Sequence, residues 1–471
     1  MRWMAPSASP LPAPPTPSVA RGRLGGLLAL AGVSVAMAWL WGFTVDDALI
    51  TCRVATHLAR GLGYRFNPAG PLVDAVTPLG FAYLLAPFAG SGPLGALAAA
   101  KWLGALLVAG AALILGRRIL QRTSAAYGVA LLLCLAVTAP VSAWAVSGME
   151  TGLVTLLAVV ALGPGRLADL AAALAAALRP ELAPWCCCVR LGLRIQSGTP
   201  LGRALSAPAL VLGAVALVGA VRAVVFGRAA PLSVFAKPSD LAHGASYALY
   251  SFVQTGLPLL CVAPFSLRRG APVARVIVVS GLLHFLALMM AGGDWMSLYR
   301  LAVPVLPSFV LGAAELWRVA PAWSSWLRVG VAGAMSVYVG AAVGPVARGV
   351  GADRQRLIEA ARAPLAGAKV VAALDVGWVG AVDDFMVVDL AGVTDESVAM
   401  LPGGHTSKRI DDSLLRNRDV DALVLLAYPP DDELVREVER RVALTPTAQG
   451  FRIVARLPIA GGQRYVVFRK P

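Results

Sequence analysis

Long apolar runs separated by short polar stretches dominate the first three quarters of the chain. The first run, Leu24 to Phe43, has about the 20 residues that an α-helix needs to span a bilayer. Further apolar segments lie at 78–90, 96–116, 125–146, 150–163, 166–178, 205–226, 250–266, 273–291, 299–317 and 326–345. Several are shorter than a full span. We therefore expect about ten or eleven transmembrane helices, with a short or re-entrant piece near 78–90 or 166–190.

The pattern changes after residue 345, where short β-branched runs bounded by turn residues predict strands. The stretch 431–442 predicts an amphipathic helix, and 451–469 predicts a hairpin that turns at Gly461 and Gly462. These features together predict a small soluble α/β domain. The three runs that predict its strands are Lys369–Asp375, Phe385–Gly392 and Asp421–Tyr428.

Three regions follow from this pattern. Residues 1–23 are rich in Pro, Ser and Ala, which predicts a disordered cytoplasmic tail. Residues 24–345 are predicted to form a multi-spanning membrane domain, and residues 346–471 the soluble domain. Arg21 and Arg23 precede the first span, so the positive-inside rule predicts an inside N-terminus. The C-terminal domain is expected outside, because the last span runs outward if the basic loop from Arg318 to Arg328 is inside. A cleaved signal peptide is the alternative for the first run, but its apolar region would be shorter, about 7 to 15 residues.

Composition agrees with a membrane protein, because 58% of the residues are hydrophobic and 14% are charged, against about 25% charged in soluble domains. Residues 1–345 contain 24 Lys and Arg against 9 Asp and Glu, whereas 346–471 contain 17 of each. The net charge of +15 thus belongs to the membrane part. Topology signals and anionic lipids account for such an excess, so we expect membrane lipids as partners and no nucleic acid.

The cysteines do not predict a disulfide framework or a zinc site. They form no CxxC pair, and no HExxH or similar ligand spacing occurs in the chain. Most lie in apolar stretches, which is typical of small buried side chains. The six are Cys52, Cys134, Cys186, Cys187, Cys188 and Cys261.

Candidate chemistry is concentrated in the loop 44–77 after the first span. Asp46 and Asp47 are adjacent carboxylates at the water edge of a membrane helix, where ionised groups tend to be functional. On a helix starting there, Asp46, Arg53 and His57 lie along one stripe, at helical spacings. The alternative is that both aspartates cap an interfacial helix, and that His57 is structural.

Several motifs in this loop and beyond resemble one family. DDALIT-CR, GLGYRFNP and VDAVTP resemble the first outer loop of bacterial GT-C glycosyltransferases related to the mycobacterial terminal arabinofuranosyltransferases. The resemblance continues, in the same order, through SGMETGL (147–153), RPE (179–181), GGDWMSLYRLAVPVLP (292–307) and LDVGWVG with VVDLAGVTD (374–395). It therefore covers nearly the whole chain. A departure is VDAVT at 73–77, where relatives commonly have VEGYT, and it bears on the sugar or acceptor preference.

The resemblance implies an inverting transfer of a sugar, such as arabinofuranose or another pentose or hexose, from a polyprenyl phosphate donor. The acceptor would be a cell-envelope glycan or lipid outside the bacterial inner membrane. Such chemistry needs a general base and groups that stabilise the departing phosphate. Asp46 or Asp47 is the candidate base, the other orienting the acceptor or a metal, and Arg53 is a candidate for the phosphate.

Other polar residues of the membrane part are candidates for substrate binding, each with a structural alternative. Glu150 binds sugar hydroxyls or a divalent ion, or simply stabilises a helix N-terminus. Asp294 and Arg300 bracket a glycine-rich turn that allows close approach to a ligand. Lys237 lies near the lipid phosphate, or snorkels to headgroups. No cofactor is assigned, and a Mg²⁺ or Mn²⁺ ion held by Asp46, Asp47 or Glu150 with the donor phosphate stays open.

Two other functions remain as alternatives. A transporter or flippase for a lipid-linked or polar substrate would place ionisable groups near the bilayer midplane and show an internal repeat. Here the carboxylates are predicted at the outer ends of spans, and no repeat is visible. A structural membrane protein whose outer domain recruits partners would leave the clustered acidic residues without a role.

Overall fold

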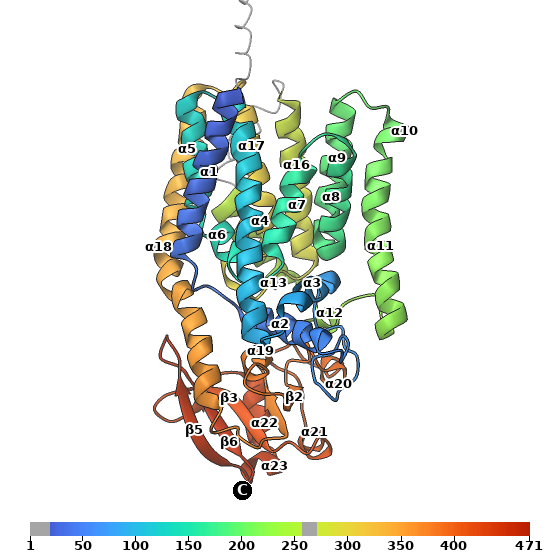
Figure 1. The fold of residues 1–471 in the computed structure, drawn as a ribbon, viewed down its shortest axis with the longest axis vertical. Helices are drawn as coiled ribbons and strands as arrows, with labels where there is room; N and C mark the ends of the chain where they lie inside the picture. Colours follow the sequence, from blue (N-terminus) through green and yellow to red (C-terminus); the bar gives the residue numbers. More distant parts are fainter. Residues whose placement is uncertain (1–18, 257–270) are drawn as a thin grey trace, which may run out of the picture.

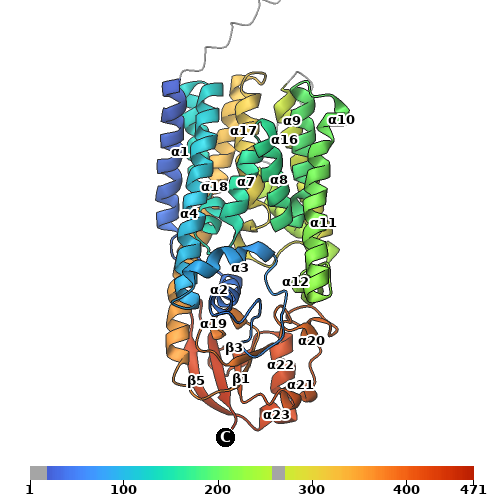
Figure 2. The same cartoon turned by 45° about the vertical axis from the view of Figure 1, so that its right-hand side comes forward.

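The computed structural model describes residues 19–256 and 271–471, which form a helical bundle joined at one end to a small sheet domain (Figures 1 and 2). The helices of the bundle and of its base are α1 (Val19–Trp39), α2 (Asp46–Ala59), α3 (Leu79–Leu85), α4 (Pro93–Arg122), α5 (Ala125–Ala136), α6 (Ala139–Ala145), α7 (Thr151–Ala161), α8 (Gly165–Leu178), α9 (Ala183–Gln196), α10 (Leu201–Ala204), α11 (Ser206–Phe226), α12 (Leu232–Ala236), α13 (Leu241–Ser251), α16 (Pro272–Met290), α17 (Leu306–Leu316) and α18 (Ala322–Ala361). Short turns of 3-10 or π helix follow α3, α8 and α13 and lie between α16 and α17.

Five helices in the described residues are long and apolar enough to cross a membrane, or six if the bent pair α5–α6 is one span. Other predicted spans are shorter helices, such as α7 with 11 residues and α8 with 14. The expected number of ten or eleven therefore exceeds the helices of full spanning length, because an apolar run does not fix how many of its residues become helical. The segment 250–266 lies partly outside the described residues.

Small residues bring the first helix of the bundle close to α4. A side chain at Gly25 would collide with the Gly116 carbonyl, and one at Gly116 would collide with the Gly25 carbonyl. Such contacts between small residues are typical of membrane helix pairs, where packing replaces the hydrophobic effect. α1 begins at Val19, so the predicted disordered tail is helical from 19 to 23, and its remainder lies outside the described residues.

The C-terminal sheet has the strand order β2-β1-β3-β6-β5, with the short β4 paired to β3. β1 is parallel to β2 and β3, whereas β6 is antiparallel to β3 and β5. The three predicted strands and the hairpin are confirmed, and Gly461 and Gly462 have positive φ at its turn. The strands are β1 (Val370–Ala373), β2 (Met386–Asp389), β3 (Ala422–Tyr428), β4 (Glu433–Leu434), β5 (Arg452–Pro458) and β6 (Arg464–Arg469).

The helix predicted over 431–442 is wrong in its first half. Asp432 has a positive φ of 58°, and Glu433–Leu434 pairs with β3 instead, so the helix α22 (Glu437–Ala443) starts later. Ladder hydrogen bonds to β3 outweigh the local helical pattern. The other short helices of the domain are α19 (Val376–Val379), α20 (Glu396–Ala399), α21 (Asp412–Asn417) and α23 (Pro446–Gln449).

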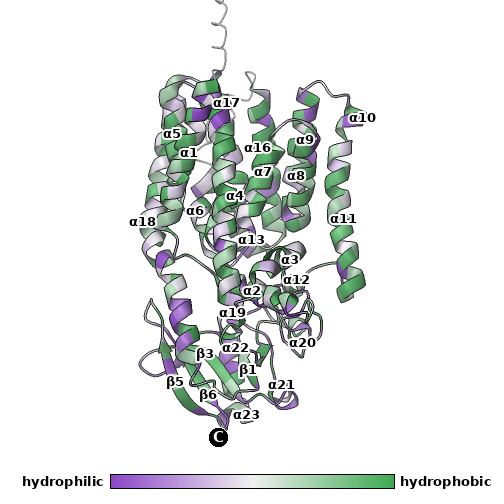
Figure 3. Ribbon diagram, in the orientation of Figure 1, coloured by the Kyte–Doolittle hydropathy of each residue, from purple (hydrophilic) through white to green (hydrophobic). Residues whose placement is uncertain are grey.

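One helix joins the two parts. α18 has 40 residues and runs from the bundle to the sheet, so the expected boundary at residue 345 falls inside it. Its surface changes from apolar in the bundle to strongly polar near the sheet (Figure 3). A backbone hydrogen bond from Gly351 to the Gly42 carbonyl (2.8 Å) ties α18 to the end of the first helix.

Candidate functional site

The helix α2 lies between the bundle and the sheet domain (Figure 2) and positions both candidate aspartates. It packs on α3 and α4 on one side and on α19 on the other. Every residue from Ala48 to His57 is buried, which explains its largely apolar sequence. The helix ends before Gly61 and Gly63, whose positive φ values of 74° and 85° are typical of glycines that terminate helices.

The Asp46 carboxylate binds backbone N–H groups of α19 in the sheet domain. It accepts hydrogen bonds from the backbone N–H of Gly377 (2.7 Å) and Trp378 (2.9 Å). A side chain at Gly377 would collide with the Asp46 carbonyl, so glycine permits this approach. Burial raises the pKa of Asp46 to about 7, because the lowering effects of Arg354 and the two N–H groups do not offset the desolvation.

Arg53 and His57 do not line either of the cavities described below. Arg53 is buried and donates to the carbonyls of Phe66 (2.8 Å), Phe385 (2.7 Å) and Gly380. Its guanidinium is therefore used to join α2 to the sheet domain, which leaves it unavailable to a phosphate. The His57 Nδ1 lies 3.0 Å from the Arg65 carbonyl, and burial lowers the pKa of its imidazole.

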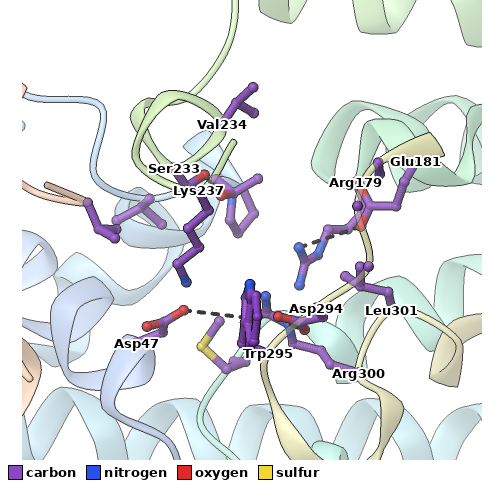
Figure 4. Close-up of a pocket in the computed structure, with 18 of the residues that line it drawn as sticks. Asp47, Arg179, Glu181, Ser233, Val234, Lys237, Asp294, Trp295, Arg300 and Leu301 are labelled. Atoms are coloured by element: carbon purple, nitrogen blue, oxygen red, sulfur yellow. Dashed lines mark hydrogen bonds and ion pairs between the residues drawn. The ribbon is translucent and has the colours of Figure 1, made fainter. Parts of the chain in front are cut away.

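The first cavity, of about 210 Å³, lies where the bundle meets α2 and brings together residues that are far apart in the sequence (Figure 4). Asp47 reaches it from α2, Lys237 from the end of α12, and Arg300 from the loop after α16. Apolar side chains such as Ile50, Val76 and Met149 and further polar ones line the remainder of its wall. The predicted candidates Asp47, Lys237, Asp294 and Arg300 thus share one cavity, together with Arg179 and Glu181.

Charges in this cavity are only partly matched. Arg300 pairs with Asp294 (2.9 Å) and approaches Asp47 at 3.7 Å, and the Asp47 side chain is 26% exposed. The Lys237 ammonium has no hydrogen-bond or ion-pair partner among the described residues. Figure 4 shows it directed toward the same space as Asp47. The cavity thus offers one lysine, and one carboxylate with only a long ion pair, to a ligand.

Glu150 is not at the cavity surface. It is fully buried at the N-terminus of α7 and pairs with Arg179 at 2.6 Å. Arg179 also pairs with Glu181 at 3.5 Å. Glu150 therefore has the structural position considered above, at a helix N-terminus. Its carboxylate orients the Arg179 guanidinium.

The loop between α16 and α17 is strained where it borders the cavity. Gly292, Gly293, Leu298 and Tyr299 all have positive φ, and for the last two this conformation is costly. The Trp144 indole N–H donates to the Leu298 carbonyl at 3.0 Å and fixes this geometry. Strain of this kind is often stored at functional sites.

A second cavity, of about 320 Å³, adjoins the first on the side of the sheet domain. Asp47, Ile50, Lys237, Trp295 and Val393 line both cavities and separate them. The additional residues around the second cavity come mostly from α18 and the sheet domain, and the charged or titratable ones are Asp46, Arg354, Asp375, Asp389, His405 and Arg436.

The charged groups of the second cavity are largely paired with one another. Asp375 accepts from Arg436 (2.6 Å) and from the Tyr465 hydroxyl. Burial alone would raise the pKa of Asp375, but Arg436, Arg354 and Tyr465 hold it below its usual value. Burial, with the nearby Lys237 ammonium, lowers the pKa of His405 to about 4, so the imidazole is neutral at physiological pH.

Three further aspartates of the sheet domain are held by contacts within the protein. Asp395 accepts from the N–H of Ser397 (3.0 Å) and caps α20. Asp389 accepts from the N–H of Ala391 (2.8 Å) and Thr394 (2.7 Å) in a turn, and burial raises its pKa to about 6. Asp375 makes ion-pair and hydroxyl contacts instead.

Comparison with known proteins adds no relative. No family model matches the chain, and no curated protein matches it at a significant level. Within the described residues no group of three or more His, Cys, Asp or Glu side chains is placed to hold a metal ion. The three carboxylates named above as possible ligands of a metal ion, Asp46, Asp47 and Glu150, therefore form no such group among these residues.

Proposed function

We propose that the chain is a multi-pass membrane glycosyltransferase of the GT-C type, which moves a sugar from a polyprenyl phosphate to a cell-envelope glycan or lipid. One observation carries this proposal. A single cavity at the base of an apolar helical bundle combines Asp47 with the cations Lys237, Arg179 and Arg300. A phosphate on a lipid chain needs cations beside an apolar phase, and an acceptor hydroxyl needs a base.

The same residues account for the reaction in one displacement. The acceptor hydroxyl gives its proton to the Asp47 carboxylate while its oxygen attacks the anomeric carbon from the face opposite the phosphate. The bond between that carbon and the phosphate oxygen breaks, and the polyprenyl phosphate leaves with the electron pair. Lys237 and Arg300 stabilise the negative charge that develops there, in a partly buried site where such stabilisation is strong.

Asp47 is a better candidate base than Asp46. Asp47 lines both cavities and is partly exposed, whereas the Asp46 carboxylate is occupied by two backbone N–H groups. We therefore assign Asp46 a positioning role, which is to hold α2 against α19. Arg53 joins Asp46 in that role, since all four of its hydrogen bonds go to backbone carbonyls, three of them in the sheet domain.

The distribution of basic residues supports one orientation in the membrane. Arg117, Arg118 and Arg122 end α4, and Arg194 and Arg203 lie near α10, at the end of the bundle far from the sheet (Figure 1). The positive-inside rule puts that end in the cytoplasm and the cavities with the sheet domain outside. This supports an inner-membrane protein that works on the extracytoplasmic face.

The test is transfer by the purified protein in lipid, with radiolabelled polyprenyl-phosphate sugars and envelope glycan acceptors. We expect Asp47→Asn to lower the transfer rate by about 10² to 10⁴-fold, the usual contribution of a general base. Asp46→Asn should keep more activity than Asp47→Asn and lose thermal stability instead. Wild-type rates in Asp47→Asn would contradict the assignment of the base. No transfer from any donor, with lipid-linked sugar moved across the bilayer, would favour a flippase.

A further inference from the structure

Trp295 is the least explained residue at the boundary between the two cavities. Its side chain is 58% exposed, although Asp294 next to it is 8% exposed and Arg300 is 9% exposed. An indole left open in a polar cavity forgoes the burial of apolar surface that normally stabilises it. Its exposure therefore suggests a ligand that covers it.

The ring is held in place before any ligand arrives. The His243 imidazole lies parallel to it, with ring centroids 3.9 Å apart and an angle of 6°. The His243 Nε2 is 3.3 Å from the Asp294 carbonyl, and Asp240 caps the helix that carries His243. One face of the indole is thus covered, and in Figure 4 the ring is seen nearly edge-on at the centre of the site.

Charge distinguishes what the two cavities attract. The first has an unpartnered lysine near two arginines and suits an anionic phosphate. In the second, Asp46, Asp375 and Asp389 are hydrogen-bonded within the protein, and His405 is neutral. Lys237 lines both cavities, but a phosphate bound in the first would already engage it, so a second anion would gain little in the second. A neutral polyhydroxylated ring, with one apolar C–H face and hydroxyls at its rim, matches this cavity better.

We propose that the second cavity binds the acceptor saccharide, with Trp295 as the platform on which the sugar ring that accepts the transfer stacks. This rests on the proposed function, because Asp47 then serves as the base for that ring's hydroxyl. Trp295, Asp47 and Lys237 all line both cavities, so a sugar on Trp295 lies at the junction where donor and acceptor meet. His405, at 5.1 Å from the Trp295 ring, borders the same platform.

Binding without catalysis tests the platform directly. Methyl and octyl glycosides of arabinofuranose, galactofuranose and mannopyranose, as mono- and disaccharides, are titrated against wild type, Trp295→Ala and Trp295→Phe by saturation-transfer NMR. We expect at least one glycoside to bind wild type, about tenfold weaker binding to Trp295→Ala, and recovery in Trp295→Phe. Trp323→Ala is the matched control, because Trp323 is 68% exposed and lines neither cavity.

Kinetics separate this inference from the proposed function. In the transfer assay, Trp295→Ala should raise the acceptor KM about tenfold and leave the donor KM unchanged. Active wild type with an unaltered acceptor KM in Trp295→Ala overturns the platform but keeps the glycosyltransferase. Wild type that binds no glycoside of the panel also overturns the platform. Absence of transfer from every donor, with glycosides still bound at Trp295, overturns the proposed function alone.

Discussion

The two adjoining cavities contain similar residue types but use them differently. Asp294 and Arg300 in the first pair with each other, yet Lys237 has no partner among the described residues and Asp47 has only a long contact of 3.7 Å. In the second, Asp375 has two side-chain donors, Arg436 and Tyr465. Charges left without a close partner are available to a substrate, whereas paired charges such as Asp375 and Arg436 stabilise the sheet domain. Removing a charge should therefore affect binding in one cavity and stability in the other.

The largest effect is expected for Asp375→Asn. The change leaves the Arg436 guanidinium without its closest partner in a buried setting, and breaking such a pair costs about 3 to 5 kcal/mol. Thermal unfolding in detergent should show a midpoint several degrees lower. The affinity for a polyprenyl phosphate should stay close to wild type.

The control for this change is Glu437→Gln in the same domain. Glu437 pairs with Arg441 on the exposed side of α22, and exposed pairs contribute about 0 to 1 kcal/mol. Equal stability of Asp375→Asn and Glu437→Gln would contradict the view that the second cavity's charges are structural.

An intermediate effect is expected for Lys237→Met, which should change ligand affinity and leave stability unchanged. Loss of a charge-assisted hydrogen bond to a phosphate costs about 1.5 to 3 kcal/mol, which is roughly a 10- to 100-fold weaker affinity. Titration with farnesyl phosphate measures it. The melting temperature should not fall, because the ammonium has no protein partner among the described residues. Lys470→Met, at an exposed position near the C-terminus, is the control. Unchanged farnesyl phosphate affinity would remove Lys237 from the phosphate site.

A separate effect is a pH dependence of stability, which comes from Asp46 at the contact between α2 and the sheet domain and from Glu439 inside the sheet domain. Burial raises the pKa values of Asp46 and Glu439 to about 7, above their ordinary values of 3.8 and 4.5. Raised carboxyl pKa values give a contribution that is complete below the ordinary values and lost as the pH rises through about 7. The loss is at most about 1.4 kcal/mol per pH unit for each group.

Melting curves between pH 5 and 7.5 test this dependence. The midpoint should fall as the pH rises, and the double change Asp46→Asn with Glu439→Gln should flatten the curve, since neither amide titrates. Asp375, whose pKa is lowered, affects only more acidic conditions. A midpoint that rises with pH in wild type would contradict the burial of these two carboxyls.

Local pattern was sufficient for the elements that depend on local residues. The strands β1, β2 and β3 and the hairpin were predicted because β-branched runs end at turn residues, and α2 because its stripe and terminal glycines are contiguous. The helices α9 and α13 were missed because their apolar faces are short and interrupted by polar residues.

The site itself depends on contacts that spacing does not reveal. Arg53 was placed correctly on α2 but assigned to a phosphate, because its carbonyl partners at Gly380 and Phe385 lie more than 300 residues away. Trp295 and His405 were missed as site residues for the same reason. The tryptophan beside the two glycines of the GGDW turn was the one available signal, and its exposure is visible only in the structure.

The continuous helix α18 has a mechanical consequence for a polymeric acceptor. Forty helical residues extend roughly 60 Å, about twice the thickness of the hydrocarbon core of a bilayer. In the membrane orientation proposed above, half of this helix extends beyond the bilayer and holds the sheet domain at a fixed distance from it. Under the proposed function, that distance determines how close to the membrane a polymeric acceptor must come to reach a lipid-linked sugar.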